Sequence, residues 1–62
     1  MCEANVYLVK DGHEKVVMES VDVLRPKGDS IYLESIFGER LEVKAHIKEM
    51  NLVDHRILLA ED

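Results

Sequence analysis

The chain has 62 residues, of which 47% are hydrophobic and 34% charged; this composition is typical of a globular protein and excludes a disordered one. The formal net charge of −5 disfavours a broad nucleic-acid surface, because such surfaces neutralise phosphates with Lys and Arg. No apolar run approaches the roughly 20 residues that a membrane-spanning helix needs. We expect a single small β domain over residues 1–62 that gains stability by forming a homodimer.

The first half of the chain alternates short apolar stretches with turn residues. The stretch Cys2–Val9 predicts a strand, because every second residue is apolar or small. Asp11–Gly12 predicts a tight hairpin turn. Residues 14–26 (EKVVMESVDVLRP) predict a long strand that Glu19–Ser20 interrupts with a bulge or bend. A loop over residues 26–30 follows.

The second half contains the clearest pattern in the chain. Residues 30–37 (SIYLESIF) predict a third strand, and Gly38–Glu39 predicts the turn after it. In residues 41–48 apolar and polar residues alternate strictly, which predicts one half-buried strand and excludes an amphipathic helix. Residues 49–51 are interpreted as a short turn or a single helical turn. A last strand is expected over Arg56–Ala60.

These elements predict an all-β fold with about five short strands. A sheet of this size hides one face by curling on itself, so we expect a small five-stranded barrel of the SH3-like or Sm-like kind. An exposed edge strand has unpaired backbone groups that can pair with a second copy of the chain. We therefore expect the barrel to be dimeric.

The sequence offers little support for catalysis or for a structural zinc site. No nucleophile elbow and no glycine-rich phosphate loop is present, and nothing in the spacing pairs a histidine with Cys2. We therefore expect no enzyme, and we interpret the three histidines as solvated surface residues: His13, His46 and His55. One cysteine without paired ligands does not make a zinc site or an internal disulfide. With no signal peptide in view, we expect a reducing cytoplasm.

The amino terminus carries the strongest candidate for chemistry. The chain begins MCEANVYL, with its only cysteine at position 2. The amine of Met1 and the amide nitrogen of Cys2 can close one five-membered chelate ring on a metal, and the amide nitrogen and thiolate of Cys2 can close a second. Glu3, through its carboxylate or its amide, or a water could fill the fourth position. Such amine, amide and thiolate donors favour square-planar Ni(II) or Cu(II) over zinc, and thiolate tends to reduce Cu(II).

Two alternatives remain open at this terminus. If Met1 is removed, Cys2 offers its own amine and thiolate, and two protomers could join to make a shared site. Cys2 is alternatively a small buried hydrophobic residue in the first strand, in phase with Ala4. The residue types alone do not decide whether Cys2 is a metal ligand or a buried hydrophobic residue.

The chain resembles the CooT family of small nickel-binding proteins, which includes an accessory protein of the nickel-containing carbon monoxide dehydrogenase. Three stretches carry the resemblance, MCEANVYL, VMESVDVL and IKEMNLVDHRILL, together with the glycine turns at Gly28 and Gly38. The resemblance implies a homodimeric β protein that binds Ni(II) through Cys2, with Met1 and Glu3 as neighbouring donors. It also implies a nickel enzyme or its maturation machinery as a partner.

Two other functions are weighed against this one. An Sm-like module would bind RNA or a protein, and the net charge and the lack of an aromatic and basic patch in the sequence speak against RNA. A structural dimerisation domain would use Cys2 for packing only. We expect a nickel-binding metallochaperone, with no membrane and no nucleic acid among its partners.

Overall fold

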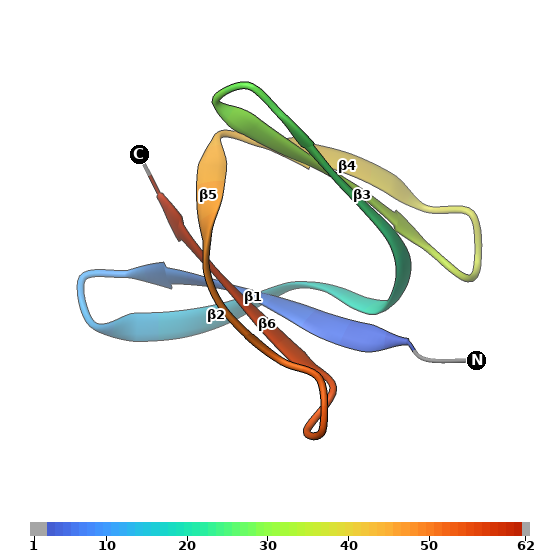
Figure 1. The fold of residues 1–62 in the computed structure, drawn as a ribbon, viewed down its shortest axis with the longest axis horizontal. Coiled ribbons are helices and arrows are strands. Elements are labelled where there is room, and N and C mark those ends of the chain that lie inside the picture. The colour runs from blue at the N-terminus through green and yellow to red at the C-terminus, as the bar shows by residue number, and fades with distance from the viewer. Residues whose placement is uncertain (1–2, 62) are drawn as a thin grey trace.

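The structure, a computed structural model, describes residues 3–61, and within them the protein is all-β. The six strands are β1 (Ala4–Lys10), β2 (His13–Lys27), β3 (Ser30–Ser35), β4 (Arg40–Val43), β5 (Ala45–Asn51) and β6 (Arg56–Glu61). They form one sheet in the order β4-β3-β2-β1-β6-β5, in which only the β1–β6 pair is parallel. The sheet curls into an open half-barrel, so that β3 also contacts β5 across its interior (Figure 1).

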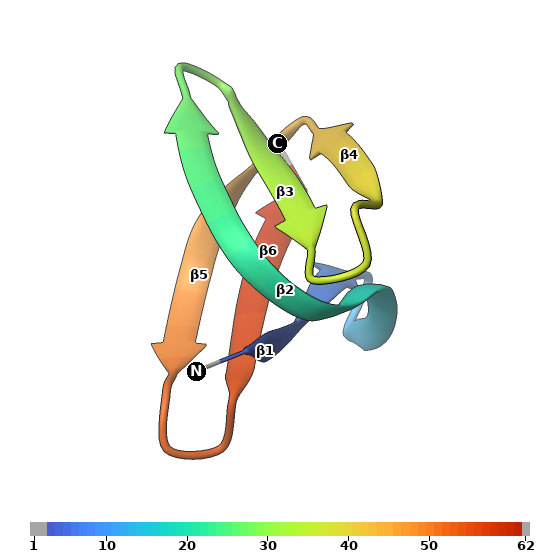
Figure 2. The ribbon, with the colours of Figure 1, turned by 90° about the vertical axis from the view of Figure 1, so that its right-hand side faces the viewer.

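The long strand β2 bends and belongs to both halves of the sheet. Its first part pairs with β1 and its second part with β3, and the register shifts on both sides of the bend. Figure 2 shows β2 as one curved ribbon that rises from the β1–β2 turn to lie beside β3. The predicted interruption at Glu19–Ser20 is confirmed, because Ser20 has a φ of 56° and the register with β1 shifts there.

Two hydrogen bonds hold the backbone of Ser20 in this left-handed conformation. The Ser20 amide donates to Asn5 Oδ1 at 3.2 Å, and the Ser20 carbonyl accepts from the Ile36 amide at 2.9 Å. A left-handed conformation costs roughly 1–2 kcal/mol for a residue other than glycine. The two partners offset this cost and connect the bend to the start of β1 and to the end of β3.

The prediction of five strands is wrong, because residues 41–48 form parts of two strands. The chain bends at Lys44, so that β4 pairs with β3 and β5 pairs with β6. Val43 and Ala45 nevertheless both pack on the core, one on each side of the bend. The alternation therefore continues through the corner, and a period of two cannot distinguish one straight strand from two strands at an angle.

The turn predicted over residues 49–51 is also wrong, because β5 extends to Asn51. Ile47 pairs with Leu59 and Glu49 pairs with Leu58, so Lys48 is the extra residue of a bulge. The bulge breaks the alternation that marked the preceding residues. The strand predicted from the alternation is therefore about three residues too short, because the alternation ends at the bulge but the strand continues.

The core lies on the concave face of the curled sheet. The alternation predicted for the first strand is confirmed there, since Val6 is fully buried and Ala4 and Leu8 pack against the core. The buried hydrophobic residues are Val6, Met18, Val21, Ile31, Leu33, Ala45, Ile57 and Leu59. In residues 3–61 no helix is long and apolar enough to cross a membrane.

Leu33 and Leu41 face each other across β3 and β4, and they provide a matched test of the core. Leu33 is 0% exposed and Leu41 is 37% exposed. We expect Leu33→Ala to lower the free energy of unfolding by about 2–5 kcal/mol, because it leaves a cavity. Leu41→Ala should cost about 1 kcal/mol, since its site is partly solvated. Urea unfolding measures both, and equal losses would contradict this placement of the core.

Candidate functional site

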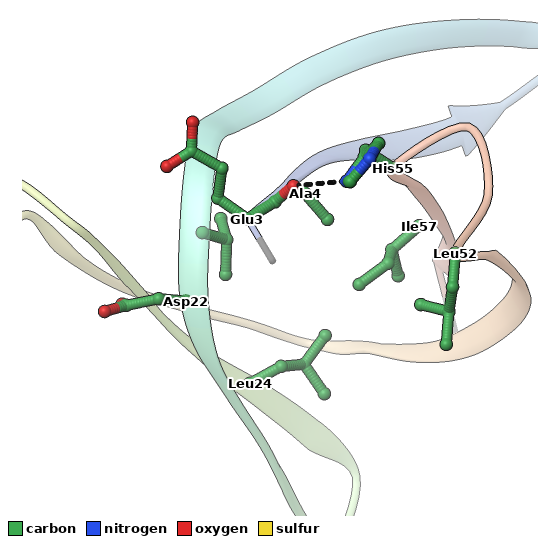
Figure 3. A pocket seen from close by; sticks show the side chains of 8 residues that line it. Glu3, Ala4, Asp22, Leu24, Leu52, His55 and Ile57 are labelled. Carbon is green, nitrogen blue, oxygen red and sulfur yellow. Dashed lines mark hydrogen bonds between the residues drawn. The ribbon is translucent and has the colours of Figure 1, made fainter. Parts of the chain in front are cut away.

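The turn between β5 and β6 meets the start of β1. The Asn5 amide donates to the His55 carbonyl at 2.9 Å, and His55 Nδ1 lies 3.0 Å from the Glu3 carbonyl oxygen (Figure 3). A carbonyl oxygen only accepts hydrogen bonds, so Nδ1 is the donor. In the neutral imidazole, Nε2 then keeps its lone pair, which is the arrangement that metal-binding histidines use.

Local turn chemistry explains why His55 is placed here. The Asp54 amide donates to Asn51 Oδ1 at 3.1 Å, and the His55 amide donates to the Leu52 carbonyl at 3.3 Å. Asn is favoured in such turns because its side chain hydrogen-bonds the backbone a few residues further on. His55 itself has a φ of 56°, a conformation in which Asn, Asp and His are the commonest residues after glycine.

A pocket of about 200 Å³ lies beside this contact. In Figure 3 the side chains of Leu24, Leu52 and Ile57 point toward one another, whereas the carboxylates of Glu3 and Asp22 point outward. The pocket is therefore apolar inside and acidic at its rim. The Glu3 carboxylate is directed away from His55, and the backbone carbonyl of Glu3 is the group that His55 contacts.

The structure tests only part of the predicted metal site. Met1 and Cys2, the expected main donors, lie outside the described residues. Glu3 is exposed at the start of the described chain. Within residues 3–61 no group of three or more His, Cys, Asp or Glu side chains is placed to hold a metal ion. A metal site at this end therefore needs donors from residues 1 and 2 or from a second chain.

His55 is a candidate site residue that the local sequence does not indicate. The prediction that His55 is a surface residue is confirmed, because the residue is exposed. Its ring is nevertheless bonded to a residue 52 positions away, a contact that no local spacing reveals. His13 differs, because it begins β2 and lines a separate surface hollow with Lys10 and Lys15. The Asn51-to-Asp54 turn was the one available signal, and it does not indicate what the turn approaches.

An aromatic and basic cluster that the sequence reading did not expect lies on β2 and β3. The Tyr32 ring centroid is 5.8 Å from Arg25 Cζ and 5.4 Å from Lys27 Nζ. Glu42 reduces the local charge, since its carboxylate lies 3.9 Å from Lys27 Nζ. The cluster is thus small, with two cations and one carboxylate, in a chain whose formal net charge is −5.

A family model and a solved structure that match this chain both carry the name CooT. The family model described as "CO dehydrogenase accessory protein CooT" matches residues 1–60. A crystal structure named for CooT from Carboxydothermus hydrogenoformans superposes with a TM-score of 0.92 at 46% identity, covering 98% of each chain. The uncharacterized protein MJ1551 of Methanocaldococcus jannaschii is 30% identical over 59 residues, which are 95% of this chain and 96% of the relative.

The left-handed backbone at His55 predicts a difference between two substitutions there. His55→Asn should change the free energy of unfolding by less than about 1 kcal/mol, because Asn adopts this conformation readily. His55→Val should cost about 1–3 kcal/mol, since a branched side chain is strained at positive φ. Urea unfolding of the two variants distinguishes them. If they proved equally stable, the turn would not hold His55 in this conformation.

Proposed function

The chain belongs to the CooT family of CO dehydrogenase accessory proteins, and we propose that it binds nickel(II) at its amino terminus as a metallochaperone. The observation that supports the proposal is the contact between His55 Nδ1 and the carbonyl of Glu3, the residue that follows Cys2 in the sequence. Under this proposal nickel is cargo, and a nickel enzyme or its maturation machinery receives it in the cytoplasm.

Each donor has a distinct role in the proposal. The thiolate and amide nitrogen of Cys2 and the amine of Met1 form two fused chelate rings. The fourth position stays open to the Glu3 carboxylate or amide and to a water, and His55 Nε2 is a further candidate. His55 is added because its Nδ1 donates to the Glu3 carbonyl, and in the neutral imidazole Nε2 then keeps its lone pair. A nitrogen-rich and thiolate-containing set of this kind suits Ni(II).

We further propose that the protein works as a homodimer. Three apolar side chains at the β5–β6 turn are exposed beside the proposed site, Met50 by 50%, Leu52 by 65% and Val53 by 90%. Exposed apolar groups that lie close together often mark contact surfaces. A second copy that covered them would bring two amino termini near each other, and donors could then come from both chains.

Nickel titration of the untagged protein tests the proposal, since any extension of the amino terminus would remove the chelating amine. We expect thiolate-to-nickel absorption bands near stoichiometric metal and their loss in Cys2→Ser. Binding should weaken as the pH falls, because the amine, amide and thiol must all lose protons. Native mass spectrometry of the same samples gives the fate of Met1, the oligomeric state and the number of metal ions per dimer.

The same experiment can reject the proposal. If the parent protein and Cys2→Ser both ignore nickel, the amino terminus is not a nickel site. RNA binding that depends on salt and survives Cys2→Ser would support the Sm-like alternative instead. A Cys2→Ser variant that loses stability while nickel leaves both proteins unchanged would assign Cys2 to packing.

A second prediction separates His55 from the other histidines. His55→Asn keeps the turn but removes the imidazole, so nickel affinity should fall by about tenfold or more. His13→Asn removes an imidazole from a different surface and should leave the affinity unchanged. Competition with a chromophoric chelator measures both values. Equal affinity in the two variants would show that His55 takes no part in metal binding.

A further inference from the structure

The turn between β3 and β4 is held rigidly around one buried hydroxyl. Ser35 is 3% exposed, and its Oγ accepts hydrogen bonds from the amides of Phe37 and Glu39, each at 3.2 Å. The Ser35 amide donates to the Glu39 carbonyl at 2.9 Å, and the Gly38 amide donates to the Ser35 carbonyl at 3.1 Å. Gly38 supplies the φ of 86° that this turn requires. Residues 35–39 are thus fixed by four hydrogen bonds.

This rigid turn presents an aromatic ring to solvent. Phe37 is 74% exposed. Ile36 in the same turn is 39% exposed, and Val16 on β2 is 46% exposed. A groove of about 260 Å³ lies between the turn and β2; we call it the Phe37 groove, and its lining residues are Val16, Val17, Met18, Glu19, Phe37 and Glu39. This set shares no residue with the pocket beside His55.

The charges around the Phe37 groove have one sign. Glu19 and Glu39 are the charged residues that line it, and neither makes an ion pair within the described part of the chain. The whole chain carries a formal charge of −5. Two copies meeting through this groove by two-fold symmetry would bring four carboxylates together, which is unfavourable. A second copy is therefore a poor occupant.

We propose that the Phe37 groove is a docking site for a segment of another protein in which aliphatic residues are flanked by lysine or arginine. The groove is smaller than the roughly 300–1,000 Å³ of typical small-molecule pockets, so a protein side chain fits its size better than a cofactor does. The turn is already ordered, so binding costs little conformational entropy there. Phe37 provides the central apolar contact, and Glu19 and Glu39 attract the flanking cations.

Nuclear magnetic resonance with the full chain and a synthetic probe tests this site. The probe is a short peptide in which lysine alternates with leucine, and the comparison peptides carry glutamate instead of lysine or serine instead of leucine. We expect amide shifts at residues 16–19 and 36–39 with the first peptide only. Phe37→Ala should weaken binding by about tenfold or more. Glu19→Gln combined with Glu39→Gln should also weaken it and reduce its salt dependence.

Matched controls keep the result specific. Leu41→Ala removes an apolar side chain that is 37% exposed and Glu49→Gln an exposed charge, both outside the groove, so neither should change the affinity. Phe37→Ala should keep its melting temperature, because the ring is exposed. Shifts spread over the whole acidic surface, or equal weakening by Glu49→Gln, would overturn the proposal. A change in native mass on Phe37→Ala would overturn it in favour of a second copy.

Discussion

The bend of β2 at Ser20 is the constraint on which the rest of the fold depends. A straight strand of that length could not pair with β1 over one part and follow the curl to β3 over the other. Two partners satisfy the bent backbone, the Asn5 side chain and the Ile36 amide. Because Asn5 also bonds His55 and Ile36 leads into the Phe37 turn, the same bend positions both surfaces to which we assign a function.

The two surfaces that the bend positions differ in the groups that they expose. At the amino-terminal end, the exposed residues Glu3 and His55 are joined by a hydrogen bond, and this is where we propose that a metal is bound and released. Ligand exchange there would not require the core to open. At the Phe37 turn, a hydroxyl with only 3% exposure stabilises a conformation that exposes an aromatic ring. At both places, hydrogen bonds within the sheet hold exposed groups that a partner can reach.

Much of the strand content followed from local patterns. The alternation around Val6, the interruption at Ser20 and the turn at Gly38 are each indicated by a few adjacent residues, and the sequence predicts all three. The corner at Lys44 and the extension of β5 to Asn51 were not predicted. A corner leaves the alternation intact, so the pattern predicted one strand where the structure has two. A bulge breaks the alternation, so the pattern predicted a strand that was too short.

The candidate site also contains one residue that the sequence indicates and one that only the fold brings to it. The sequence suffices to propose Cys2 as a nickel ligand, because adjacent backbone and side-chain donors can chelate a metal without any fold around them and because the chain resembles the CooT family. It does not suffice for His55, because the position of His55 beside Glu3 depends on the parallel pairing of β1 with β6, which joins segments from opposite ends of the chain. Local chemistry is encoded in neighbouring residues, whereas a contact across 52 positions exists only once the sheet has formed.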